Sequence, residues 1–164
     1  MVSIKSINVK SDSLIKLSTE LLVLAQKEGG SLSELNSELN NIMNSAIHLE
    51  SFTGKSGKTV HAYGDDTTKR VSVFGLGKDD NITTDGIRAL ASKISVYANS
   101  LKLASFLVDG DSFGLSNSNY AQAFAEGLVL GAYEFLDYKS KKKDSNTLNS
   151  VNILGAIDAS SITK

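Results

Sequence analysis

The sequence predicts an α/β domain of three layers, in which a mixed central sheet carries helices on both faces. Short apolar runs typical of strands alternate with longer segments whose apolar residues recur every three or four positions, as on an amphipathic helix. The predicted order is strand, strand, helix, strand, strand, helix, strand, helix, strand, which is typical of helices packed on a sheet. A polar turn at 64–67 between two strands predicts an antiparallel hairpin, and hence a mixed sheet.

Two strands and a helix are expected in the first third of the chain. Apolar residues alternate loosely over 2–9, and the continuous apolar run 21–25 is typical of an interior strand that is covered on both faces. Ser31 and Glu34 then have the spacing of a capping box, which predicts that a helix begins there. An apolar stripe over 32–47 predicts a helix of about four to five turns.

The middle of the chain predicts a hairpin, a second helix and another strand. The hairpin strands are 58–63 and 70–74, the amphipathic helix spans 87–101, and the short strand covers 103–108. Within the hairpin, alternation predicts that His61 points away from the face that its two neighbours share.

The third predicted helix, 119–138, is apolar almost all round and is therefore expected to be buried against the sheet. Ala123, Gly127 and Gly131 fall four apart, so they form one ridge that lets the backbone approach a neighbouring element. Glu126 interrupts the apolar surface, and a structural pairing partner is expected for it. The last strand is predicted at 148–154.

Composition excludes several kinds of chemistry. The 164 residues fit one domain of about 100–200 residues, and 17 basic against 18 acidic side chains give a net charge of −1, without a global basic footprint for nucleic acid. The chain has no Cys and two His, so thiolate zinc sites, cysteine nucleophiles and three-His metal sites are excluded. No apolar run reaches membrane-spanning length, and we expect a cytoplasmic protein without membrane contact.

Two features are candidates for a ligand site. Gly75, Gly77 and Lys78 follow a predicted strand, where glycines can present backbone N–H groups to an anion or form a tight structural turn. Asp109, followed by Asp111, comes at the C-terminal end of a strand, the edge where α/β sheets usually bind ligands. Two carboxylates are too few for calcium, and turn residues capping the strand are the alternative.

A lysine cluster follows the third helix and consists of Lys139, Lys141, Lys142 and Lys143. These lysines are a candidate basic contact for phosphate or DNA. The alternative is a solvated helix end, because cations in the last turn of a helix also complement its dipole.

Three segments resemble the N-terminal domain of the leucyl (cytosol) aminopeptidases, a metallopeptidase family. They are the strand and loop Val71-Ser-Val-Phe-Gly-Leu-Gly-Lys78, the turn Phe52-Thr-Gly-Lys-Ser-Gly57, and the closing-helix string from Ala125 to Lys143. The resemblance covers nearly the whole chain and is strongest over 70–143. It implies a macro-like α/β module covering residues 1–154, with residues 155–164 beginning a linker to a catalytic domain.

The resemblance also implies what the catalytic domain does. In that family it binds two divalent metals, zinc or manganese, through Asp, Glu and Lys residues, and it releases N-terminal amino acids from peptides. The signature Asn-Thr-Asp-Ala-Glu-Gly-Arg-Leu is absent here, so we assign no catalytic and no metal-binding residue to this chain. The implied partners are its own catalytic domain and the sister subunits of a homohexamer, and some members contact DNA through this domain.

The leading hypothesis is a non-catalytic N-terminal domain that contributes to oligomer assembly and to active-site access in the full-length enzyme. One alternative is a free-standing macro-like module that binds a nucleotide or ADP-ribose through the 75–78 loop and Asp109. Another is a DNA-contacting domain that uses the lysine cluster.

Overall fold

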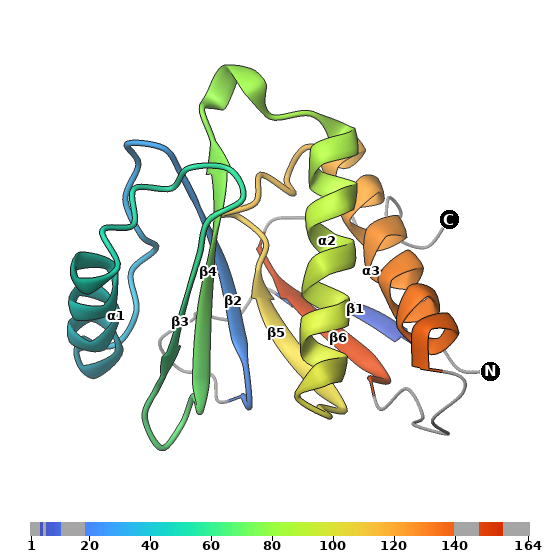
Figure 1. The fold of residues 1–164 in the computed structure, drawn as a ribbon, viewed down its shortest axis with the longest axis horizontal. Helices are drawn as coiled ribbons and strands as arrows, with labels where there is room; N and C mark the ends of the chain where they lie inside the picture. Colours follow the sequence, from blue (N-terminus) through green and yellow to red (C-terminus); the bar gives the residue numbers. More distant parts are fainter. Residues whose placement is uncertain (1–3, 5, 11–18, 140–147, 156–164) are drawn as a thin grey trace.

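The computed structural model describes residues 4, 6–10, 19–139 and 148–155 (Figure 1). Within them the chain forms one sheet of order β1-β6-β5-β2-β4-β3, together with three α-helices and a short 3-10 turn, η2. The strands are β1 (Ser6–Lys10), β2 (Leu22–Lys27), β3 (Thr59–Tyr63), β4 (Arg70–Gly77), β5 (Ser105–Asp109) and β6 (Ser150–Leu154). The helical elements are α1 (Ser37–Leu49), η2 (Asp79–Asn81), α2 (Thr84–Ser100) and α3 (Ser118–Lys139).

The sheet is mixed, as the sequence predicts. Strands β1, β6, β5, β2 and β4 pair in parallel, and only β3 is antiparallel to its neighbour β4. Asp65 closes the β3–β4 hairpin, because its carboxylate accepts the backbone N–H groups of Thr67 and Thr68 at 3.0 and 2.8 Å. These hydrogen bonds, that from Thr68 first, lower the pKa of Asp65.

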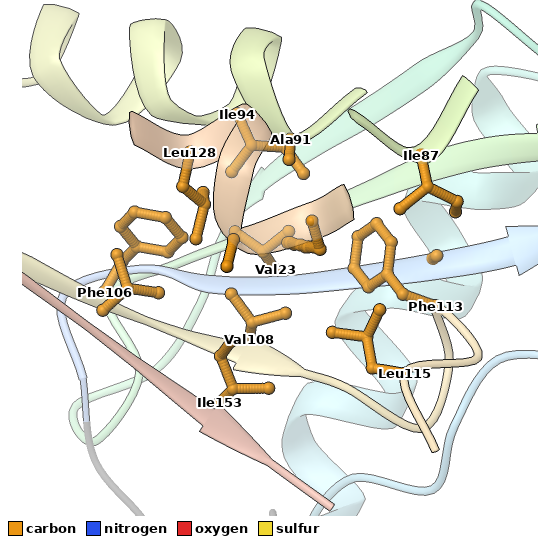
Figure 2. Packing of buried hydrophobic residues seen from close by; sticks show 14 of the residues in the cluster. Val23, Ile87, Ala91, Ile94, Phe106, Val108, Phe113, Leu115, Leu128 and Ile153 are labelled. Atoms are coloured by element: carbon orange, nitrogen blue, oxygen red, sulfur yellow. The ribbon is translucent and has the colours of Figure 1, made fainter. Parts of the chain in front are cut away.

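Helices cover both faces of the sheet, which confirms the predicted layers. On one face α2 and α3 pack over β2, β5 and β6, and Val23, Val108 and Ile153 of these strands belong to one buried core with Ile94 of α2 (Figure 2). On the opposite face α1 packs over β2, β3 and β4 (Figure 1). Because side chains alternate along a strand, β2 feeds both cores and is buried throughout except at its last residue.

The first helix begins later than the capping-box pattern at 31–34 predicts. Helix α1 starts directly after Asn36, whose side-chain oxygen accepts the N–H of Leu39 at 2.9 Å. The side-chain amide of Asn40 pairs with both backbone groups of Leu35 at 2.7 and 3.1 Å. Asn36 therefore caps the first turn of the helix and Asn40 satisfies the backbone just ahead of it, and residues 31–35 are not helical.

Helices α2 and α3 touch backbone to backbone along the predicted glycine ridge. A Cβ atom on Gly127 would collide with the carbonyl group of Arg88 and would lie 2.8 Å from the Cβ of Ala91. A Cβ on Gly131 would lie 2.9 Å from the Cα of Ser92. Both positions require glycine because no side chain fits between the helices, which confirms the close approach.

Candidate functional site

The glycines at the end of β4 donate their N–H groups inside the protein. Gly75 N–H donates to the carbonyl of Lys58 at 2.8 Å, and Gly77 N–H donates to the carbonyl of Gly54 at 2.9 Å. Gly77 has a φ of 82°, which favours glycine. The geometry therefore supports a tight structural turn at these glycines. An anion could bind their amides only by displacing both hydrogen bonds.

Lys78 follows these glycines as an exposed residue ahead of η2. The neighbouring Asp79 forms an ion pair with Lys27 of β2, with 2.7 Å between Nζ and Oδ1. Both side chains of that pair are about half exposed or more, so the ion pair contributes little to stability.

Asp109 is a buried carboxylate at the end of β5, with 4% of its surface exposed. The hydroxyl of Ser33, in the loop before α1, donates to its Oδ2. Ser112 donates to the Asp109 backbone carbonyl at 2.8 Å and accepts the N–H of Ala25 at 2.9 Å. Burial raises the pKa of Asp109, against the lowering effect of the Ser33 hydrogen bond.

The two predicted parts of the ligand edge are not adjacent. Strand β2 lies between β4, which carries Gly75, and β5, which carries Asp109. The partners of Asp109 come from the loop after β2 and the turn after β5, whereas Gly75 contacts the turn before β3. The structure thus separates the glycine turn from the carboxylate.

The predicted lysine cluster falls almost wholly beyond what the structure describes. Lys139 is the last residue of α3. Lys141, Lys142 and Lys143 lie outside the described residues. The basic contact stays a prediction.

His61 points away from the face of Val60, as the alternation predicts, and stacks on Tyr97 of α2 with ring centroids 4.5 Å apart. Its Nδ1 lies 2.7 Å from the hydroxyl of Ser72. Partial burial lowers the pKa of His61. These contacts hold the imidazole against α2 and describe a packed histidine rather than a catalytic one.

Glu126 has the structural partner that the sequence predicts. Its Oε1 accepts hydrogen bonds from Arg88 Nε at 3.1 Å and Nη2 at 3.0 Å. The same guanidinium reaches Asp85 Oδ1 at 2.6 Å through Nη1. Arg88 therefore links the first turn of α2 to the middle of α3.

The residues that the structure describes contain no group of three or more His, Asp or Glu side chains able to hold a metal ion. They do not fit the two-metal centre that the resemblance implies for a catalytic domain. None of the helices in this part of the chain is long and apolar enough to cross a bilayer.

A pocket of about 260 Å³ lies beside Gly75. Three separate segments line it: the turn into β3, the end of β4, and the stretch from Asn81 at the end of η2 to Lys93 in the middle of α2. Sequence reasoning missed this pocket because no single motif marks it; its lysines, Lys58 and Lys93, are 35 positions apart in the sequence.

The raised pKa of Asp109 predicts a pH-dependent stability. A carboxyl whose pKa is higher in the folded state stabilises the protein below its usual pKa, and this contribution is lost as pH rises through the raised value. Asp109→Asn cannot ionise, so its stability relative to the wild type should increase between pH 4 and pH 7. Urea unfolding of both proteins at the two pH values measures this change.

Ser33→Ala is the matched control. Because the Ser33 hydroxyl stabilises the ionised carboxylate, its removal should lower the stability more at pH 7 than at pH 4. A pH-independent difference between Asp109→Asn and the wild type would contradict the assignment.

Comparison with known proteins points to one family. Residues 21–142 match the family model described as the cytosol aminopeptidase family, N-terminal domain. A probable cytosol aminopeptidase of Sulfurihydrogenibium sp. (strain YO3AOP1) is 33% identical over 140 residues, which cover 84% of this chain and 27% of that protein. The chloroplastic leucine aminopeptidase A2 of Solanum lycopersicum is 38% identical over 128 residues, covering 76% of this chain and 22% of that protein.

The fold of this chain is likewise similar to the folds of solved structures. A solved structure of a tomato leucine aminopeptidase mutant superposes with a TM-score of 0.77 at 27% identity, covering 96% of this chain and 34% of that one. The bottromycin maturation enzyme BotP shares the fold with a TM-score of 0.64 at 19% identity, over 88% of this chain and 29% of that one. The chain thus spans about a third or less of the length of these relatives.

Proposed function

The chain belongs to the cytosol aminopeptidase family, and we propose that it is the non-catalytic N-terminal domain of a leucyl aminopeptidase. The observation that carries the proposal is the family match over residues 21–142, in a part of the chain where the described residues hold no metal-binding group. In this proposal residues 1–154 form the domain, and residues 155–164 begin a linker to the catalytic domain.

The parent protein proposed here is a two-metal exopeptidase that releases N-terminal amino acids from peptides. Its zinc or manganese ions would lie in the catalytic domain. A cytoplasmic location is proposed after the cytosol aminopeptidases, although the tomato relatives are named as chloroplastic.

The proposed role of the domain is to contribute to assembly of a homohexamer and to active-site access. Surface features support such contacts. Strand β3 is an edge strand of the described sheet, and an edge strand leaves backbone N–H and C=O groups for another chain. Tyr63 on this strand is 77% exposed, and Leu49 at the end of α1 is 80% exposed. In this proposal both side chains are buried by contacts with other parts of the full-length assembly.

An activity assay tests the non-catalytic assignment. We expect the purified chain, supplied with manganese or zinc, to release no chromophore from a leucyl chromogenic substrate above the blank. A full-length leucine aminopeptidase under the same conditions is the positive control. Hydrolysis by the chain that scales with its concentration and disappears with a chelator would refute the proposal.

The reading frame beyond Lys164 tests the domain role separately. We expect a continuation that carries the acidic metal signature of the family. A stop codon at that point would instead favour a free-standing binding module.

A further inference from the structure

The pocket beside Gly75 lies between the end of β4 and α2. The turn before β3, the end of β4 and the start of α2 meet at the same end of the sheet (Figure 1). The floor is apolar, with Phe74 and Leu76 from β4 and Ile87 and Leu90 from α2. A ligand that fits this floor needs an apolar body.

The rim of the pocket is cationic. Lys58, from the turn, and Lys93, from α2, are lining residues, and no Asp or Glu is among the residues that line it. Neither lysine forms an ion pair with a described residue. Three acidic residues lie next to the pocket segments. Asp79 and Asp85 are paired with other cations, and Asp80 precedes the lining residue Asn81 but does not itself line the pocket.

Neutral donors and a helix end add to this positive character. Ser56, Thr59 and Asn81 lie among the lining residues and supply two hydroxyl groups and one amide. Thr83, the N-cap of α2, and Gly86 in its first turn also line the pocket. The Thr83 hydroxyl already accepts the Gly86 N–H at 3.0 Å, so this helix end contributes through its dipole, which favours negative charge. Lysines, donors and dipole therefore all favour an anion.

We propose that this pocket binds a small anion with an apolar body, of the class of a carboxylate attached to a branched aliphatic or aromatic group. The volume of about 260 Å³ lies just below the range of about 300–1,000 Å³ that is typical of ligand pockets, so the ligand is small. A zwitterion fits less well, because no lining carboxylate would pair with its ammonium group. The proposal does not depend on the proposed function.

Titration of the ¹⁵N-labelled chain, followed by NMR, tests the proposal with four matched probes. Isocaproate carries a carboxylate and an isobutyl group, acetate the carboxylate alone, isopentylamine an ammonium on a similar branched chain, and leucine both charges. We expect isocaproate to shift the amide signals of Gly75, Gly86 and Ile87 at millimolar concentration. The other three probes should bind more weakly.

Single substitutions test which lining residues contact the charge of the ligand and which contact its apolar body. Lys58→Gln and Lys93→Gln should each weaken isocaproate binding about two- to fivefold, the range expected for one exposed ion pair. Leu90→Asn should weaken isocaproate but leave acetate unchanged. Lys78→Gln is the matched control, because Lys78 is exposed in the same region but does not line the pocket.

Each contrary result overturns the proposal. Absence of shifts with isocaproate would exclude the site, and equal binding of isopentylamine would exclude the selection for an anion. Equal binding of acetate would exclude the need for an apolar body. Unchanged affinity in both lysine variants would place the anion elsewhere.

Discussion

Replacing Phe124 with alanine should lower the free energy of unfolding by about 3–5 kcal/mol, the range typical of a buried phenylalanine. Phe124 lies in α3, is completely buried, and packs edge-to-face on Phe113 with ring centroids 5.0 Å apart. Phe113 in turn lies in the turn after β5, close to Ile87 and Leu115 (Figure 2). The substitution leaves a cavity where α3 meets this turn, and the close-packed surroundings can fill it only in part.

Urea unfolding followed by circular dichroism measures the loss. Leu130→Ala is the control on the same helix, because Leu130 is 47% exposed and should lose much less stability. If Phe124→Ala cost no more than this surface variant, the described packing of α3 would be wrong.

The layers of the fold follow from the sequence because burial and periodicity coincide in this chain. The apolar run 21–25 predicts a strand covered on both faces, and β2 does lie between α1 on one face and α2 with α3 on the other. The hairpin is predictable for a local reason, since Asp65 closes its own turn within three residues.

The start of α1 could not be predicted from the capping-box pattern, because a second set of polar side chains competes with it. Asn36 caps the N–H of Leu39 in the first turn, and Asn40 satisfies the backbone of Leu35 just ahead of the helix. Ser33 is bonded to Asp109, far away in the sequence. Such a contact between distant residues has no local signature, so local spacing gave the wrong start.

The candidate site was harder to predict than the fold, because contacts between distant residues decide it. A glycine-rich turn after a strand can present its N–H groups to an anion, but Gly75 and Gly77 donate theirs to Lys58 and Gly54. The pocket beside them depends on segments that only the folded chain brings together. Local spacing reports which residues are available for a site, whereas tertiary contacts decide which of their groups are free.

Replacing Gly127 with alanine should destabilise the protein by about 2–3 kcal/mol, within the range expected for overpacking a filled interior. The added methyl group would meet the Arg88 carbonyl and the Ala91 Cβ, and α2 and α3 must separate because a backbone carbonyl cannot rotate away. Alanine favours helix by about 1 kcal/mol over glycine, so a destabilised variant would show that packing outweighs helix propensity here.

Thermal unfolding decides between these two effects. For a chain of this size, the expected loss corresponds to a lower Tm by about 4–12 °C. Gly86→Ala is the matched control, because Gly86 is an exposed residue of α2 whose added Cβ would meet only the Thr83 hydroxyl, at 3.2 Å. That variant should unfold close to the wild-type Tm, since its gain in helix propensity is set against one tight contact with a rotatable side chain and not against a backbone carbonyl. If Gly127→Ala behaved like Gly86→Ala, propensity alone would govern α3, and the backbone contact between the two helices would not be required for stability.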